Sequence, residues 1–278
     1  MRTIAHISDL HFGRHSAPVA EALFKSVNES RPHLIALSGD FTQRARNAQF
    51  AEARRFLDRF SQPKLLVPGN HDVPLYNVFR RFLGPFTKYD HHFGAIGQPA
   101  NYFRDEEIAV LGINTARRFT RKNGRISVEQ MVEIGRTFRD IPSNIFKVLV
   151  THHPLAIPSG EAAVELAGRA TPALEILKNA GVHLLLSGHH HRALSGGTAE
   201  VGDDGTILVL HAGTAISTRT RGIEGNTYNL LHIADGNVAV RLMEHAQDRF
   251  QEKSLDNFFF DHGRWIRSQS VVAKTIQR

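Results

Sequence analysis

The sequence predicts an α/β fold in which two packed mixed β-sheets are flanked on their outer faces by helices. Apolar segments of strand length alternate with longer amphipathic segments along the chain. In the early part, strands and helices alternate as they do in β-α-β units. The later part is rich in strands joined by tight turns such as Asp203-Asp204-Gly205. With 278 residues and 41% apolar content, the chain can bury a large core in one domain.

The expected elements follow from this pattern in chain order. Short apolar runs bounded by turn residues predict strands at 2–8, 33–38, 64–67, 108–113, 146–151, 182–187, 206–211, 228–233 and 236–243. Segments whose apolar side chains recur at helical spacing predict helices near 17–30, 46–60, 127–138 and 171–179.

We predict one main domain over residues 1–243 and a C-terminal extension over residues 244–278. Segments near 74–100 and 154–171 are expected to form a cap over the ligand crevice. The extension combines aromatic and basic side chains, namely Phe258, Phe259, Phe260, Arg264, Trp265, Arg267, Lys274 and Arg278. Packing of the aromatics onto the chain's own domain or a partner subunit is the favoured interpretation, and peripheral contact with an anionic membrane is the alternative.

Composition restricts the kind of site that this chain can build. Cysteine is absent, which excludes a disulfide framework, so any metal site must use carboxylate, amide and imidazole ligands. Lys and Arg total 34 against 27 Asp and Glu, and this net charge of +7 favours anionic partners. No secretory segment precedes the strand at 2–8 and no apolar run approaches the roughly 18 residues of a membrane span, so we expect a cytoplasmic protein.

Five short clusters of metal-ligand residues occur at the ends of predicted strands. They are Asp9-Leu10-His11, Gly39-Asp40, Gly69-Asn70-His71-Asp72, His152-His153 and Gly188-His189-His190-His191. Ligand sites in open α/β sheets lie at the carboxyl ends of the strands, so the clusters are expected to converge on one crevice. Glycine opens three of them, as expected where the backbone turns sharply against a metal.

The clusters contain enough oxygen and imidazole donors for two divalent metal ions that share one carboxylate. Two such ions, about 3.5 to 4 Å apart, bind both oxygens of a phosphate ester and generate a bound hydroxide for in-line attack. Oxygen and nitrogen ligands suit Mn, Fe, Zn or Co, and the sequence leaves the choice among them open.

The ordered set DLH, GD, GNHD, HH and GHHH resembles that of the calcineurin-like metallophosphoesterase superfamily. Within it, the chain is most similar to bacterial class III cyclic nucleotide phosphodiesterases and related glycerophosphodiesterases. The resemblance runs from about Ile4 to Gly222. It implies the four-layer sandwich of that superfamily, with two metal ions as cofactors.

The resemblance also implies a role for each motif residue. The first metal ion would be held by Asp9, His11 and His191. The second would be held by Asn70, His152 and His189, and Asp40 would bridge the two ions. His71 would contact the phosphate or protonate the leaving alkoxide, with Asp72 fixing its orientation. The resemblance assigns no ligand role to His153 and His190.

One departure from the superfamily bears on the substrate. Its phosphoprotein phosphatases carry GDxxDRG, whereas here Gly39-Asp40 is followed by Phe41-Thr42-Gln43-Arg44. The missing residues argue against Ser/Thr phosphatase activity and favour a small-molecule or lipid phosphodiesterase. Arg44 is a candidate contact for the substrate phosphate. The basic stretch 117–125 is either a substrate-steering loop or a solvated loop, and the sequence leaves both interpretations open.

The leading hypothesis is a binuclear metal-dependent phosphodiesterase acting on a small diester, either a 3′,5′-cyclic nucleotide or a glycerophosphodiester. A phospholipase C-like hydrolase of phospholipid headgroups is the alternative. A noncatalytic metal-bound scaffold for nucleic acid is less consistent with the intact ligand set, and no RNA- or DNA-binding motif indicates nucleic acid as a specific partner. A nuclease is a third hypothesis and ranks below hydrolysis of small diesters, because the chain has no evident second domain to hold a duplex. Family likeness alone makes a homodimer, formed through the strand-rich C-terminal part or the cap, plausible.

Overall fold

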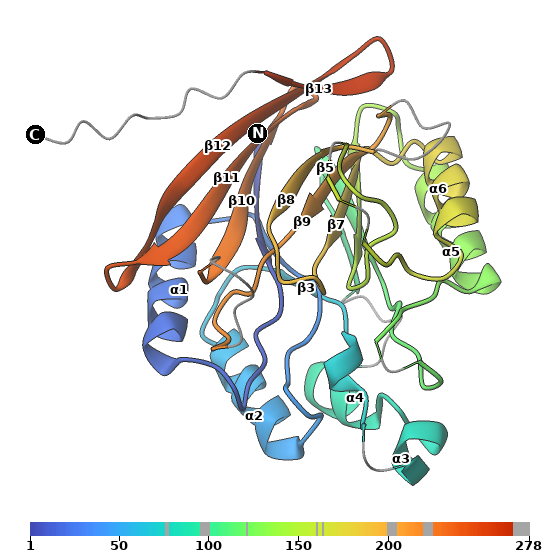
Figure 1. Ribbon diagram of the computed structural model, residues 1–278. Coiled ribbons are helices and arrows are strands. Elements are labelled where there is room, and N and C mark those ends of the chain that lie inside the picture. Colours follow the sequence, from blue (N-terminus) through green and yellow to red (C-terminus); the bar gives the residue numbers. More distant parts are fainter. Residues whose placement is uncertain are drawn as a thin grey trace, which may run out of the picture.

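The structure is a computed structural model that describes residues 1–75, 78–94, 101–120, 122–159, 161–162, 164–198, 205–218 and 225–268. Two β-sheets pack face to face, and helices cover the outer face of each sheet (Figure 1). This arrangement of helix, sheet, sheet and helix confirms the architecture that the sequence predicts.

The first sheet has seven strands from both ends of the chain. They are β1 (Arg2–Ile7), β2 (Leu34–Leu37), β3 (Lys64–Leu66), β10 (Thr227–Ala234), β11 (Asn237–Ala246), β12 (Arg249–Asp261) and β13 (Arg264–Ser268). Their spatial order is β13-β12-β11-β10-β1-β2-β3. Strands β1, β2 and β3 are parallel, whereas the strands from β10 to β13 pair antiparallel and β10 joins β1.

The second sheet has six strands from the middle of the chain. They are β4 (Tyr102–Arg104), β5 (Ile108–Ile113), β6 (Phe146–Thr151), β7 (Leu184–Ser187), β8 (Leu194–Gly197) and β9 (Leu208–His211). Their order is β4-β5-β6-β7-β9-β8, with β5, β6, β7 and β9 parallel. These four central strands are buried along their whole length, which explains why they read as continuous apolar runs.

The helices divide between the two sheets. They are α1 (Ala17–Ser30), α2 (Asn47–Leu57), the 3₁₀ turn η1 (Asn70–Asp72), α3 (Val78–Leu83), α4 (Thr87–Phe93), α5 (Val128–Arg139) and α6 (Ala170–Asn179). Helices α1, α2 and α4 share a core with the first sheet, and α5 and α6 share one with the second (Figure 1). No helix in the described ranges has the length and apolar content to cross a membrane.

Alternation along β1 shows how the sequence sets these layers. Ile4 belongs to the apolar core between the two sheets, whereas Ala5 and Ile7 belong to the core beneath α1 and α2. Side chains on a strand point alternately to its two faces, so one strand contributes to both cores. The loop after β1 is thereby held between two packed layers, where the first ligand cluster begins.

The C-terminal residues differ from the predicted extension. The boundary expected at 243 falls inside β11, and β12 and β13 continue the same sheet by antiparallel pairing. Phe258 and Trp265 are buried in the core between the sheets, while Phe259 and Phe260 are partly exposed. Hydrogen bonding to β11 and burial of the two aromatics integrate this segment through residue 268. Lys274 and Arg278 lie outside the described residues.

The expected cap near 74–100 also splits into two parts. Tyr89 and Phe93 of α4 are buried in the core of the first sheet, where they pack against Phe41. By contrast, Phe79 and Leu83 of α3 are exposed. Only the α3 part therefore projects from the core, while residues 76–77 and 95–100 lie outside the described ranges.

Replacement of Trp265 by alanine is expected to lower the free energy of unfolding by about 3 to 5 kcal/mol, because it leaves a cavity between the sheets. Its ring is 6% exposed and lies 6.0 Å, centroid to centroid, from that of Phe146 in the other sheet. Urea denaturation measures the change. Phe79→Ala, at a side chain 74% exposed, is the control. Equal losses for the two variants would show that β13 does not anchor the core.

Candidate metal centre

The five ligand clusters converge at one end of the two sheets. Each follows the carboxyl end of a parallel strand, β1, β2 and β3 in the first sheet and β6 and β7 in the second. Because the sheets pack face to face, loops from both meet at this end. The structure thus brings together all seven residues expected to bind metal: Asp9, His11, Asp40, Asn70, His152, His189 and His191.

The first ligand group consists of Asp9, His11 and His191. The Nε2 atom of His191 lies 3.1 Å from Oδ1 of Asp9 and 3.2 Å from Nε2 of His11. The same His11 nitrogen lies 3.6 Å from Oδ1 of Asp9. Three donor atoms therefore face one small volume, as the sequence resemblance implies.

The second ligand group consists of Asn70, His152 and His189. The amide oxygen of Asn70 lies 3.1 Å from Nε2 of His152 and 3.1 Å from Nδ1 of His189. Donor atoms bound to one ion at about 2.1 Å are separated by about 3.0 to 3.5 Å, which matches this spacing.

Asp40 lies between the two groups. Its Oδ2 atom is 3.8 Å from Nε2 of His11 in the first group and 3.4 Å from Nε2 of His152 in the second. Its Oδ1 atom accepts a hydrogen bond of 2.8 Å from the backbone N–H of His71. One carboxylate oxygen thus faces both groups, which is the placement of a bridging ligand.

Burial and charge show that these residues fit bound cations. The side chains of Asp9 and Asp40 are almost fully buried, and Oδ1 of Asp9 faces the imidazoles of His191 and His11 at 3.1 and 3.6 Å. A buried carboxylate needs a positive partner or its burial is very costly. Two divalent ions would supply that charge to a donor set made of hard oxygens and imidazole nitrogens.

Mutual contacts set the protonation of these side chains. Although burial opposes it, Asp40 raises the pKa of His152 to about 9, so a metal ion would displace a proton from this ring. Burial alone would raise the pKa of Asp9, but the imidazoles of His191 and His11 hold it well below its usual range. Burial opposes ionisation of Asp40 in the same way, and His152 keeps its pKa low as well. Burial and the neighbouring His152 lower the pKa of His189 to about 3, so this ring is a neutral donor at pH 7.

Backbone strain is concentrated at this centre. Positive φ is uncommon for residues other than glycine and costs of order 1 to 3 kcal/mol. Five of the seven ligand candidates nevertheless adopt it, with φ values of 54° at Asp9, 50° at His11, 54° at Asp40, 74° at His189 and 57° at His191. Such strain gathers where a binding site fixes the direction of its side chains, which supports a functional interpretation of the cluster.

Two glycines allow the ligand loops to approach one another. Gly39 has φ of 101°, and a Cβ atom there would lie 2.4 Å from Nδ1 of His152. At Gly69 a Cβ atom would lie 2.1 Å from Oδ1 of Asp40. The glycine at each position is therefore required by close packing against a ligand candidate.

Gly69→Ala is expected to displace the Asp40 carboxylate and to reduce the bound metal to about one ion per chain or fewer, since the bridge between the groups is lost. Elemental analysis after dialysis against Mn²⁺ measures the content. Gly135→Ala in α5 is the matched control, because a Cβ atom there would meet its nearest neighbour at 3.6 Å. Full metal occupancy in the Gly69 variant would contradict the assigned bridge.

His71 lies beside the ligand groups without belonging to either. Its Nδ1 atom lies 2.9 Å from the backbone carbonyl of Gln43 and 3.2 Å from the side-chain Nε2 of the same residue, and its ring makes an edge contact of 4.8 Å with that of His11. The bond at Nδ1 leaves Nε2 as the nitrogen that can exchange a proton with a ligand. A hollow of about 270 Å³, termed here the His71 hollow, is lined by Gln43, Arg44, Asn70, His71, Val73, Leu75 and Lys122.

The carboxylate of Asp72 does not make the contact with His71 that the sequence resemblance implies. The carboxylate accepts hydrogen bonds from the backbone N–H groups of Phe41, Thr42 and Gly69 and from the Thr42 hydroxyl, and it makes none with the His71 ring. Burial and the neighbouring Asp40 raise its pKa to about 7, while these backbone donors oppose the rise. Asp72 therefore ties the loop after β2 to the loop after β3, and the Gln43 carbonyl orients His71.

Two serines form hydrogen bonds with ligand candidates, and the sequence analysis did not predict either contact. Ser8 Oγ donates a hydrogen bond of 2.6 Å to Oδ2 of Asp9. The Ser38 carbonyl accepts a hydrogen bond of 2.7 Å from Nδ1 of His152, which directs Nε2 of that ring toward Asn70 and Asp40. The signal for Ser8 was a serine directly before Asp9, whereas Ser38 acts through its backbone carbonyl, which any residue type supplies.

The two remaining motif histidines have other contacts. His153 engages the Thr115 hydroxyl at Nδ1 and donates to the Lys122 carbonyl from Nε2. His190 Nε2 lies 3.2 Å from the backbone carbonyl of Glu165. Both nitrogens of His153 are thus occupied by protein atoms, and its contact with Lys122 fixes part of the basic loop 117–125 against the centre.

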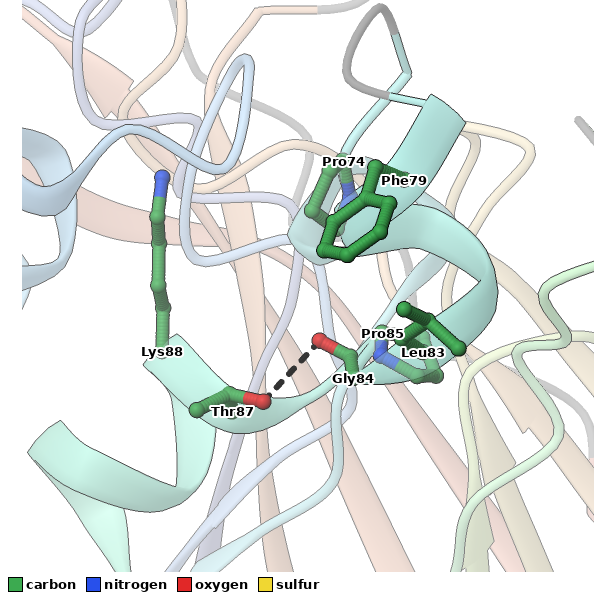
Figure 2. Close-up of a pocket in the computed structure, with 7 residues that line it drawn as sticks. All are labelled: Pro74, Phe79, Leu83, Gly84, Pro85, Thr87 and Lys88. Carbon is green, nitrogen blue, oxygen red and sulfur yellow. Dashed lines mark hydrogen bonds between the residues drawn. The ribbon is translucent and has the colours of Figure 1, made fainter.

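A second hollow lies in α3 and the turn that leads to α4. Figure 2 shows its lining, in which the Thr87 hydroxyl donates to the carbonyl of Gly84, and the residues are Pro74, Phe79, Leu83, Gly84, Pro85, Thr87 and Lys88. None of these residues is a ligand candidate. This hollow is therefore separate from the metal centre, although Pro74 directly precedes Leu75 of the His71 hollow.

Comparison with solved structures shows the same fold elsewhere. A dimetal phosphatase from Danio rerio superposes with a TM-score of 0.64 at 12% identity, covering 90% of this chain and 98% of that one. A purple acid phosphatase from yellow lupin seeds superposes with a TM-score of 0.63 at 10% identity, covering 90% of this chain and 52% of that one. At such low identity these likenesses concern the fold alone.

Similarity in sequence identifies the family of this chain. A probable cyclic nucleotide phosphodiesterase from Synechococcus sp. is 26% identical over an alignment of 204 residues that covers 69% of this chain and 74% of the relative. The sequence profile of the calcineurin-like phosphoesterases matches residues 2–193, which include every ligand candidate described above. With two ligand groups joined by Asp40 inside that matched region, the chain belongs to the calcineurin-like phosphoesterase family.

Proposed function

We propose that this protein is a binuclear metal-dependent phosphodiesterase that hydrolyses small phosphodiesters. The observation that carries the proposal is Asp40, whose single Oδ2 atom faces a histidine of each ligand group. Two ions held at such a centre neutralise both nonbridging oxygens of a phosphodiester and activate water for attack on phosphorus.

The chain's own residues would position the substrate and the leaving group. His71 borders the same hollow as the ligand Asn70, and its Nδ1 is fixed by the Gln43 carbonyl. A substrate in the His71 hollow would place its leaving oxygen where Nε2 of this ring donates a proton. The exposed Arg44 and Lys122 line the hollow and favour an anionic ligand.

A phospholipid is the second candidate substrate, because α3 presents an exposed apolar surface. Phe79, Leu83 and Phe119 are each exposed by more than 70%. The Phe82 ring contacts that of Phe119 at 5.5 Å, and the Arg118 guanidinium lies 4.7 Å from the centre of the Phe119 ring. Apolar and cationic groups side by side are suited to the surface of an anionic membrane.

A matched substrate panel tests the proposed activity. Mn²⁺-loaded protein is assayed with bis(p-nitrophenyl) phosphate, p-nitrophenyl phosphate, 3′,5′-cyclic AMP, glycerophosphocholine and phosphatidylcholine vesicles. We expect the diesters to be hydrolysed faster than the monoester, with activity lost on addition of a chelator. Preference for vesicles would favour the phospholipid. Metal-loaded protein that turns over no diester would instead favour a noncatalytic scaffold.

A further inference from the structure

A third hollow adjoins the metal centre on the side of α2. It measures about 500 Å³ and is termed here the arginine hollow, lined by Gly13, Arg14, Gln43, Arg44, Arg46 and Gln49. Gln43 and Arg44 also line the His71 hollow, so the two spaces meet at this pair. Arg14 and Arg44 belong to the same loops as the ligands His11 and Asp40.

The arginine hollow is strongly positive. Its lining contains three arginines and no carboxylate. A fourth cation lies next to it, because Nζ of Lys88 donates a hydrogen bond of 2.7 Å to the carbonyl of Ala45, between Arg44 and Arg46. The carboxylate of Glu52 in α2 is not part of this lining and faces His15, since its Oε1 atom lies 3.5 Å from Nε2 of His15. This surface is therefore suited to an anion with several acceptor oxygens.

The backbone beneath the arginines is fixed. The Gln49 side-chain oxygen accepts hydrogen bonds from the N–H groups of Arg44, at 2.9 Å, and Arg46, at 3.4 Å. The carbonyl of Arg14 accepts one of 2.8 Å from the backbone N–H of Thr218. Ala45 is buried with φ of 48°, and its N–H donates to the Thr42 hydroxyl. The guanidinium groups thus extend from a rigid base, which lowers the entropic cost of binding.

We propose that the arginine hollow binds a second anionic group of the substrate, so that the preferred substrate is a phosphodiester bearing a further phosphate on one side of the scissile bond. This inference rests on the proposed function. The diester would lie in the His71 hollow, and the additional phosphate would extend past Gln43 toward Arg14 and Arg46. A cyclic mononucleotide carries only one phosphate and would leave the arginine hollow without its anion.

A pair of chromogenic esters tests the second anionic subsite. Thymidine 5′-(p-nitrophenyl phosphate) and its 3′-phosphorylated analogue share the scissile diester and differ only in the added phosphate. At physiological ionic strength we expect kcat/KM to favour the phosphorylated ester by roughly tenfold or more, because charge-assisted hydrogen bonds to arginine are strong. Arg14→Gln and Arg46→Gln should each reduce this ratio by roughly threefold or more.

Arg55→Gln is the control for loss of one positive charge, since Arg55 is exposed on α2 and lines neither hollow. It should leave the ratio unchanged. Calorimetric titration with thymidine 3′,5′-bisphosphate and thymidine 5′-phosphate gives a second measurement that needs no turnover, and the bisphosphate should bind more tightly by a similar factor.

The outcomes separate this inference from the proposed function. The anionic subsite would be overturned, and the phosphodiesterase left in place, if the two esters had equal kcat/KM. The same conclusion would follow if Arg55→Gln lowered the ratio of the two kcat/KM values as much as Arg14→Gln and Arg46→Gln do. Absence of turnover for both esters would count against the phosphodiesterase. In that case, equal affinity for the two thymidine phosphates would overturn the subsite as well, and tighter binding of the bisphosphate, lost in Arg14→Gln, would support it.

Discussion

Replacement of Asp40 by alanine is expected to abolish phosphodiester hydrolysis, with kcat/KM reduced by at least about a thousandfold. Its carboxylate faces His11 and His152 and also accepts the N–H of His71. The substitution therefore removes the link between the ligand groups and loosens the loop that carries His71. Initial rates with bis(p-nitrophenyl) phosphate, measured together with bound Mn²⁺, check this expectation.

Asp58→Ala is the matched control for Asp40, because Asp58 is an exposed carboxylate at the end of α2 that pairs with Arg54. It should retain both activity and metal. Full metal content with unchanged turnover in the Asp40 variant would contradict the assignment of Asp40 as the bridging ligand.

His71→Ala is expected to reduce kcat by about 100- to 10,000-fold, the usual range for loss of a general acid. The metal content should be unaffected, because the His71 ring belongs to neither ligand group. The loss should be larger for glycerophosphocholine than for bis(p-nitrophenyl) phosphate, since an alkoxide needs a proton to leave and p-nitrophenolate does not.

His91→Ala, on the exposed surface of α4, is the control for His71 and should behave as the unmodified protein. Losses of equal size on both substrates would indicate that His71 binds the phosphate and does not protonate the leaving group. Turnover of both substrates at the unmodified rate would remove His71 from the mechanism.

Much of the candidate centre could be predicted from the sequence because its ligand candidates follow buried parallel strands. Runs such as Leu34–Leu37 and Phe146–Thr151 read as apolar strands, and the donors come directly after them. Parallel strands end at the same edge of a sheet, so residues that directly follow them lie close together, and this proximity can be predicted without knowing any long-range contact. The positions of Asp9, Asp40 and His152 follow from this rule.

Other features depend on contacts between distant segments. The strand β12 has the sequence RFQEKSLDNFFFD, in which polar residues predominate because most of its side chains are exposed or half-exposed. Its pairing with β11 and β13 shows that it belongs to the sheet. The role of Asp72 was missed for a similar reason, since its partners Phe41 and Thr42 lie about 30 residues away.

Titration with Mn²⁺, with metal content and activity followed in parallel, tests the proposed binuclear phosphodiesterase most directly. Metal-free protein is titrated with Mn²⁺ while bound ions per chain and hydrolysis of bis(p-nitrophenyl) phosphate are followed in the same samples. We expect two ions per chain, with hydrolysis that rises as the centre fills and is lost in Asp40→Ala. Two bound ions without diester hydrolysis, or hydrolysis that persists in excess chelator, would contradict a binuclear phosphodiesterase.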